Sequence, residues 1–145
     1  GPCLYMNARN MDKPASAGQP HTRFQAWSST GGLSWTPMTA STLTTPVTPH
    51  WTGIVANVVR LGPAATATAA PLVYAGASSP TARAAMALSV NADGTAKSWG
   101  AKQMVWPGPA GYADIVALNA THVGVLYEAG DKTFADRIQF SVVRV

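Results

Sequence analysis

Two short stretches of this chain share one turn pattern, and their recurrence constrains the fold more than any other feature. Residues 28–35 read SSTGGLSW and residues 89–99 read SVNADGTAKSW. Each begins with serine, has a polar residue two positions later, continues through glycine and ends in Ser-Trp. Each also ends one apolar stretch and precedes another. A recurring hairpin of this kind predicts radial repetition of four-stranded blades, as in a β-propeller.

The rest of the chain indicates short strands separated by turns. Glycine and proline recur every few positions, and β-branched and aromatic residues fill the stretches between them. Residues 81–90 would suit a helix by propensity, but their β-branched end and the turn after them favour a strand. The predicted fold class is therefore all-β. Strands are expected at residues 3–9, 22–28, 53–61, 71–76, 83–90, 101–106 and 137–145, with two more between 108 and 131.

Composition argues against several classes of function. The chain has 10 basic and 6 acidic residues among 145, a net charge of +4, and no basic run that would indicate nucleic acid or a membrane surface. No apolar run approaches the roughly 18 residues of a membrane span, and we expect no signal peptide. Cys3 is the only cysteine, so no internal disulfide and no thiolate metal site are expected. His21, His50 and His122 have no ligand spacing, and we expect neither a metal nor a cofactor.

The two turns resemble the Asp-box, S-x-D-x-G-x-T-W, of sialidases and related β-propellers. Thr30 and Asn91 stand where the Asp would be, and the second copy carries extra residues. In sialidases the Asp-box lies far from the active site, so these departures concern the fold and leave catalysis untouched.

Three further stretches extend the resemblance to nearly the whole chain. They are YMNAR at 5–9, SSPTARAAMALSV at 78–90, and a block that begins WPGPAGY at 106 and ends GVLYEAGD at 131. In this order they are similar to the C-terminal half of a sialidase, and the WPGPAGY stretch resembles the lysosomal-type and bacterial enzymes. The resemblance implies that residues 1–145 form about three of six blades of a catalytic β-propeller.

The resemblance implies roles for particular residues. Arg9 and Arg83 would be the second and third members of the arginine triad that binds the carboxylate of sialic acid. Tyr112 would be the nucleophile of a retaining exo-α-sialidase, which removes terminal sialic acid from glycoconjugates. Glu128 would support the first arginine of the triad, which this chain does not contain. Asp114 is expected to be a local hydrogen-bonding residue.

The chemistry of sialic acid accounts for these residue types. Its anomeric carbon carries a carboxylate, which a planar guanidinium can bind through two parallel hydrogen bonds. Most retaining glycosidases attack with Asp or Glu, whereas sialidases use tyrosine. A neutral phenol is not repelled by the anionic centre, but its free pKa of about 10 makes it a poor nucleophile. It therefore needs a general base and positive charge beside it.

The resemblance also implies parts that lie outside this chain. A whole sialidase needs the first arginine, an acid/base Asp and the Glu that activates the tyrosine. At about 40–50 residues per blade, a chain of this length makes about three blades. The expected partners are a sialylated glycan and an N-terminal half of the same enzyme, present as a second chain or a lost segment, and the chain alone is expected to be inactive. A secreted or lysosomal compartment is favoured.

Other interpretations remain open at the level of sequence. A tyrosine after a Gly-Pro turn usually packs its ring, and Arg9 and Arg83 taken singly would be solvated strand ends. The chain could be a glycan-binding propeller that kept its arginines without turnover, or a structural propeller segment that binds protein. Trp51 or Trp106 could border a pocket. The linkage preference, and hydrolysis as opposed to transfer, cannot be read from these residues.

Overall fold

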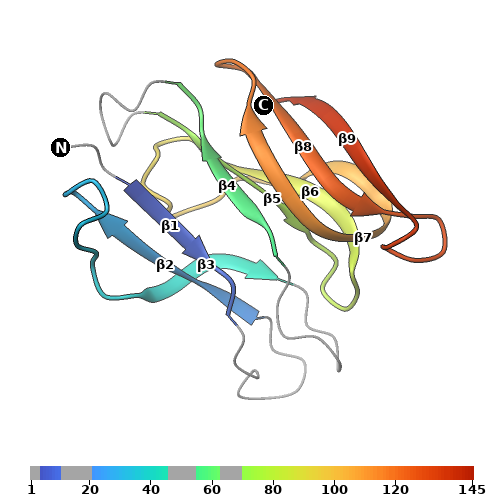
Figure 1. Cartoon of the computed structure of the whole chain (residues 1–145), viewed down its shortest axis with the longest axis horizontal. Coiled ribbons are helices and arrows are strands. Elements are labelled where there is room, and N and C mark those ends of the chain that lie inside the picture. Colours follow the sequence, from blue (N-terminus) through green and yellow to red (C-terminus); the bar gives the residue numbers. More distant parts are fainter. Residues whose placement is uncertain (1–3, 11–20, 46–54, 63–69) are drawn as a thin grey trace.

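The computed structural model describes residues 4–10, 21–45, 55–62 and 70–145. Within these residues the chain is built of strands and contains no helix, which confirms the predicted all-β class. The strands form two antiparallel sheets, with the orders β1-β2-β3 and β4-β5-β6-β7-β8-β9 (Figure 1). Their bounds are β1 Leu4–Ala8, β2 His21–Ser28, β3 Thr39–Thr45, β4 Asn57–Arg60, β5 Leu72–Ala77, β6 Ala84–Asn91, β7 Gln103–Ala117, β8 His122–Ala129 and β9 Arg137–Arg144.

Strand β7 belongs to two antiparallel meanders and joins them. Its first part pairs with β6 as far as Pro109, and from Ala110 onward it pairs with β8. The prediction of separate strands on either side of the Trp-Pro-Gly-Pro stretch is therefore wrong. Proline is tolerated inside this strand because it has no amide hydrogen to donate and lies where the strand changes partners. The second sheet thus consists of the meanders β4-β5-β6-β7 and β7-β8-β9.

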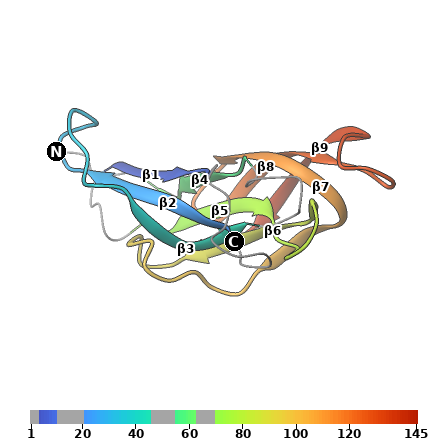
Figure 2. The ribbon, with the colours of Figure 1, turned by 90° about the horizontal axis from the view of Figure 1, so that it is seen from below.

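The first sheet is a third meander, and it lies beside the second sheet. In Figure 2 the first sheet runs from β1 at the top to β3 at the bottom, and the second runs from β4 through β5 to β6 in the same sense. Leu43 of β3 packs with Ala56 and Tyr74 of the second sheet, so apolar contact joins the two. Neighbouring meanders of this kind agree with the partial β-propeller that the sequence predicts.

The larger apolar core lies within the second sheet. It is built from β5, β6, β7 and β8, whose inward-facing side chains are fully buried. Removal of this apolar surface from water is the main stabilising contribution to such a fold. The largest of these side chains are Val73, Met86, Leu88, Val123, Val125 and Tyr127.

Strands β3, β6 and β4 differ in how far they were predicted from the sequence. β3 was not predicted, because its sequence TASTLTT is rich in β-branched threonine but has only one large apolar residue and therefore no clear alternation. The segment that would suit a helix by propensity is strand β6, as predicted. The predicted strand at 53–61 begins later, at Asn57, and residues 53–54 lie outside the described part of the chain.

The two predicted turns close in the same way. In each, the amide after the tryptophan donates to the carbonyl of the residue before the loop, at 2.8 Å in both cases. The loops therefore span residues 28–35 and 91–99. The alignment that set Asn91 opposite Thr30 is wrong by two residues, because Asp93 occupies the equivalent place.

A buried polar side chain at the start of each loop binds the backbone across it. Ser28 is 1% exposed, and its Oγ accepts a hydrogen bond from Gly32 N at 2.9 Å. Asn91 is 2% exposed, and its Oδ1 accepts from Ala96 N at 2.9 Å while its Nδ2 donates to Ser98 O at 2.7 Å. One side chain thus satisfies backbone groups that are several residues apart.

We expect Asn91→Ala to lower the free energy of unfolding by about 1–3 kcal/mol, because it leaves buried backbone groups without partners. Asn119→Ala is the matched control, since Asn119 accepts from Thr121 N at 2.9 Å in an exposed turn, and its effect should stay within about 0.5 kcal/mol. Urea titration of the chain together with its expected N-terminal half, followed by tryptophan fluorescence, measures both. Equal losses in the two variants would contradict the structural role of Asn91.

Candidate functional site

Tyr112 and Arg83 meet although they come from different strands. The Arg83 Cζ lies 4.9 Å from the centroid of the Tyr112 ring. The register of β7 against β8 shifts between Ala110 and Ala113, which places Tyr112 within a β-bulge. Bulges change the direction of side chains and are frequent beside functional sites. The phenol is 37% exposed, so it is open to a ligand while remaining in contact with the guanidinium.

Arg83 also sits beside a backbone irregularity. The register of β6 against β7 shifts after Ala84, and Ala85 has a φ of 61°, which is uncommon for a residue other than glycine. The carbonyl of Arg83 accepts a hydrogen bond from Ala110 N at 2.9 Å. This bond connects the start of β6 to the point where β7 changes partners, two residues before Tyr112.

Phe134 is a third member of the cluster; it was not singled out from the sequence, where it is a lone aromatic in a polar turn. Its ring centroid lies 4.6 Å from the Arg83 Cζ, so the guanidinium contacts two aromatic rings. Such contacts are favourable because the ring face is electron-rich. They limit the directions in which Arg83 can point.

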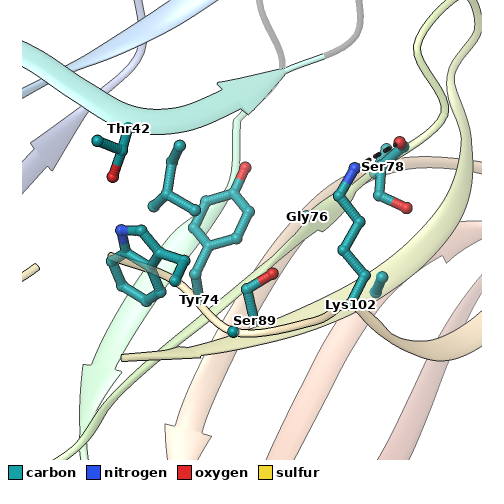
Figure 3. A pocket seen from close by; sticks show the side chains of 11 residues that line it. Thr42, Tyr74, Gly76, Ser78, Ser89 and Lys102 are labelled. Atoms are coloured by element: carbon teal, nitrogen blue, oxygen red, sulfur yellow. Dashed lines mark hydrogen bonds between the residues drawn. The ribbon is translucent and has the colours of Figure 1, made fainter. Parts of the chain in front are cut away.

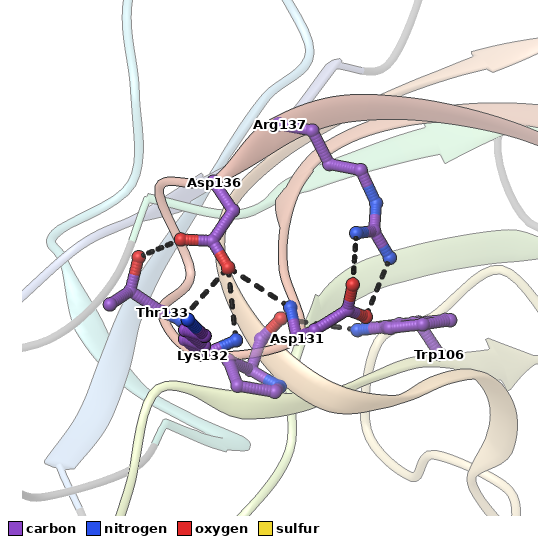
Figure 4. A network of polar contacts seen from close by, with 7 residues as sticks. Trp106, Asp131, Lys132, Thr133, Asp136 and Arg137 are labelled. Carbon is purple, nitrogen blue, oxygen red and sulfur yellow. Dashed lines mark hydrogen bonds and ion pairs between the residues drawn. The ribbon is translucent and has the colours of Figure 1, made fainter.

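The turn that carries Phe134 is held by a dense polar network (Figure 4). Asp136 Oδ2 accepts hydrogen bonds from the amides of Asp131, Lys132 and Thr133, at 2.9–3.1 Å. The hydroxyl of Thr133 and these amides lower the pKa of the Asp136 carboxyl well below its usual range. A carboxylate with so many donors keeps the turn in one conformation.

Arg9 approaches the same phenol from the other sheet. It follows the last residue of β1, and it acts on the hydroxyl of Tyr112 together with Arg83. The pKa of the Tyr112 phenol is lowered, chiefly by hydrogen bonding from Arg83 and next by hydrogen bonding from Arg9. The structure therefore brings together three of the residues singled out in the sequence, although they are far apart along the chain.

Glu128 binds the backbone of Tyr112 and not its hydroxyl. Its Oε2 accepts a hydrogen bond from Tyr112 N at 2.9 Å. Gly111 permits this approach, because a Cβ at that position would lie 2.1 Å from Glu128 Oε2 and 3.0 Å from Phe134 Cδ2. A side chain at position 111 would therefore displace the Glu128 carboxylate from the Tyr112 amide.

Asp114 joins β7 to the start of β4. Its Oδ1 accepts hydrogen bonds from Asn57 Nδ2 at 2.7 Å and from Ile115 N at 2.8 Å. The neighbouring backbone makes a parallel link, since Ala113 N donates to Val55 O at 3.1 Å. Asp114 thus helps to fix the strand that carries Tyr112.

A cavity of about 290 Å³ opens beside Tyr112. Tyr112, Asp114 and Glu128 contribute polar groups to it, and Val55, Leu126 and Ile138 contribute apolar ones. Arg9 and Arg83 are not among its lining residues, although both act on Tyr112.

A second cavity, of about 160 Å³, lies between β3 and the strands β5 and β6 (Figure 3). Its wall includes Thr42, Tyr74, Ser89 and Trp99, and Lys102 Nζ donates to Ser78 O at 3.1 Å at its edge. It contains none of the site residues predicted from the sequence.

The remaining candidates fall elsewhere. Trp106 Nε1 donates to Pro109 O at 3.2 Å, and the Arg137 guanidinium lies 5.0 Å from its ring, so it is packed and lines none of the cavities described. Trp51 and His50 lie outside the described residues.

In the described part of the chain, no three His, Cys, Asp or Glu side chains lie close enough together to ligate a metal ion. The same residues include no helix of the length and apolarity needed to cross a membrane.

Solved structures resemble this chain at the level of the fold. The Hadza microbial sialidase Hz136 matches 99% of the chain with a TM-score of 0.71 and 19% identity, and the match covers 25% of that protein. A leech intramolecular trans-sialidase, solved with 2,7-anhydro-Neu5Ac, matches 98% of the chain with a TM-score of 0.64 and 16% identity, over 22% of its own length. This chain therefore spans about a quarter of each. The resemblance to sialidases inferred from the sequence is thus confirmed for the fold.

Neither comparison by sequence adds to this. No model of a known protein family matches the chain, and the search of curated proteins found no match.

The contact between Arg83 and Tyr112 predicts that the pKa of the Tyr112 phenol depends on Arg83. Because Arg83 is the main cause of the lowered phenol pKa, we expect Arg83→Gln to raise the pKa of Tyr112 toward the free value of about 10. Tyrosine labelled with ¹³C at Cζ reports each phenol separately by NMR, and Tyr112→Phe assigns its signal. Arg137→Gln, at the guanidinium over Trp106, is the control and should leave the signal unchanged. An unchanged Tyr112 pKa in Arg83→Gln would contradict the described contact.

Proposed function

We propose that this chain is part of an exo-α-sialidase, a glycosidase that removes terminal sialic acid from glycoconjugates. The observation that carries the proposal is the convergence of Arg9 and Arg83 on the phenol of Tyr112. The fold shared with two proteins described as sialidases supports it. Two cations beside a partly exposed phenol suit a substrate whose reacting carbon bears a carboxylate.

In the proposed reaction, Arg9 and Arg83 bind the carboxylate of the sialoside and orient its anomeric carbon toward Tyr112. The phenol oxygen attacks that carbon as the bond to the leaving group breaks, and the leaving oxygen takes a proton from an acid/base Asp. Water then displaces the tyrosine, with net retention of configuration. The cations assist because a phenol with a lowered pKa carries more negative charge on oxygen in the transition state.

The rest of the catalytic machinery comes, in this proposal, from preceding blades that complete the propeller. These would supply the acid/base Asp, the Glu that takes the phenol proton and the first arginine of the triad. Glu128 is suited to support that arginine because it lines the cavity beside Tyr112 and is already fixed by the Tyr112 amide. We use "assembled protein" for this chain together with those blades.

One face of the last meander supports the proposed partner half. Large apolar side chains on β8 and β9 are about half exposed, and Leu126 lies directly opposite Phe140. An exposed apolar sheet face of this kind is typical of an interface. The residues are Leu126, Ile138, Phe140 and Val142.

In the assembled protein, Tyr112→Phe should lower turnover of a sialoside by orders of magnitude while leaving the fold intact. The ring keeps its apolar area, and only the oxygen that bonds to the anomeric carbon is lost. Affinity for a planar 2,3-dehydro analogue of sialic acid should change far less. Release of a fluorescent aglycone measures turnover, and calorimetry measures affinity.

Tyr127→Phe is the matched control, since the hydroxyl of the buried Tyr127 lies 3.1 Å from Ser141 Oγ. It should lower the melting temperature and leave turnover near that of the parent. Turnover within a few-fold of the parent in Tyr112→Phe would exclude Tyr112 as the nucleophile. A parent that binds the analogue but releases no aglycone would favour a glycan-binding propeller.

We expect the 145-residue chain expressed alone to self-associate or to unfold without a cooperative transition, because its apolar sheet face stays uncovered. Gel filtration with light scattering and thermal circular dichroism test this. Addition of the preceding blades should give a complex of defined mass and a sharper transition. A monomer with a single sharp transition would contradict the proposed partner half.

A further inference from the structure

A third arginine, Arg23, is buried near the candidate site and was not singled out from the sequence. It lies in β2 and is 2% exposed, whereas arginine is rarely buried unless its donors are satisfied. The register of β2 against β3 shifts between Thr22 and Phe24, so Arg23 lies at a backbone irregularity, as Tyr112 does.

Arg23 is bonded to the strand that leads to Arg9. Its Nε donates to the side-chain oxygen of Asn7, and its Nη2 lies 3.4 Å from the Asn7 carbonyl oxygen. Asn7 lies in β1, two residues before Arg9 in the chain. Asn7 is further fixed by its Nδ2, which donates to Tyr5 Oη at 2.9 Å. Arg23 therefore sets the backbone immediately before Arg9.

The same guanidinium is bonded to the segment that holds Tyr112. Arg23 Nη2 donates to Ala56 O at 3.1 Å, in a buried bond between the two sheets. The neighbours of Ala56 are bonded to β7, through Val55 O with Ala113 N and through Asn57 Nδ2 with Asp114 Oδ1. A continuous series of hydrogen bonds thus runs from the strand of Arg9, through Arg23, to the residues that follow Tyr112.

We propose that Arg23 is a positioning residue, which fixes Arg9 relative to Tyr112 by bonding both to Asn7 and to Ala56. Arg23 acts through Asn7 and Ala56 and does not touch the substrate. The choice of a sialic acid analogue as ligand rests on the proposed function. The contacts of Arg23 with Asn7 and Ala56 are a property of the chain itself.

A planar guanidinium is suited to this task. It carries five donors in a rigid fork and can bond to acceptors on two strands at once, whereas a lysine ammonium is a single flexible point charge. The side chain also lies 5.6 Å above the Tyr74 ring, which fixes its plane. Burial lowers the pKa of Arg23, and the charge of Arg9 lowers it further, so the two cations are close enough to interact.

The experiment compares Arg23→Met and Arg23→Lys with Arg60→Met in the assembled protein. Arg60 is a fair control, because its Nη1 also donates to a backbone carbonyl, that of Ala70 at 2.9 Å, but at the far end of β4. We expect both Arg23 variants to lose about 10- to 100-fold in kcat/KM and in affinity for the 2,3-dehydro analogue, because small displacements of a binding group have effects of this size. Arg60→Met should lower the melting temperature and leave both quantities unchanged.

Two readouts separate positioning from general destabilisation. The pKa of Tyr112, read by ¹³C NMR, should rise in Arg23→Lys, because Arg9, which helps to lower that pKa, would be displaced from the phenol. In an Arg9→Ala background, Arg23→Lys should add little further loss of affinity, because residues that act as a unit are not additive. If Arg23→Met fails to fold, Arg23→Lys and Asn7→Ala provide the same comparison.

The outcomes are distinguishable. Folded Arg23 variants with the parent's affinity and the parent's Tyr112 pKa would overturn the proposal, as would full additivity with Arg9→Ala. Loss of folding in both Arg23→Lys and Asn7→Ala would make Arg23 purely structural and overturn it as well. A parent that neither binds the analogue nor cleaves a sialoside would refute the proposed function, while the Tyr112 pKa in Arg23→Lys would still decide the positioning role.

Discussion

The convergence of like charges on one phenol is the constraint on which the rest of the structure depends. Arg83 and Arg9 both act on Tyr112, and the charge of Arg9 is felt by the buried Arg23. Cations repel one another, and the repulsion is stronger where burial removes water. The aromatic rings of Tyr112 and Phe134 and the carbonyls of the backbone offset part of it. An anion placed beside these guanidinium groups would offset the rest.

Irregularities in the strands position these charged groups. Arg23, the start of β6 after Arg83, and Tyr112 each coincide with a shift of register between neighbouring strands. A regular antiparallel ladder would send successive side chains to alternate faces. At Tyr112 the extra residue is in its own strand, and it changes the direction of the side chain. At Arg23 and at the start of β6 the extra residues are in the partner strands, β3 and β7. The site is thus built where the ladders are interrupted and not along a regular face.

The sequence predicted the fold through its local signals and missed what depends on distant contacts. The two glycine-containing loops and the apolar strands were recognisable because turns and alternation leave local patterns. Strand β3 was missed because its burial depends on contact with Ala56 and Tyr74. Arg23 was missed because a charged residue is expected at the surface, and only the approach of Asn7 and Ala56 makes its burial tolerable. Phe134 was missed because its partner, Arg83, is distant in the sequence.

The anionic and the cationic partners of Tyr112 contact different parts of the residue. Glu128 binds the main-chain amide of Tyr112, whereas the arginines act on its hydroxyl and lower the pKa of the phenol. Gly111 permits the first contact, because a side chain at that position would displace the Glu128 carboxylate. The anion therefore holds the backbone of Tyr112 without offsetting the effect of the cations on its oxygen, since a carboxylate bonded to the hydroxyl would raise the pKa of the phenol.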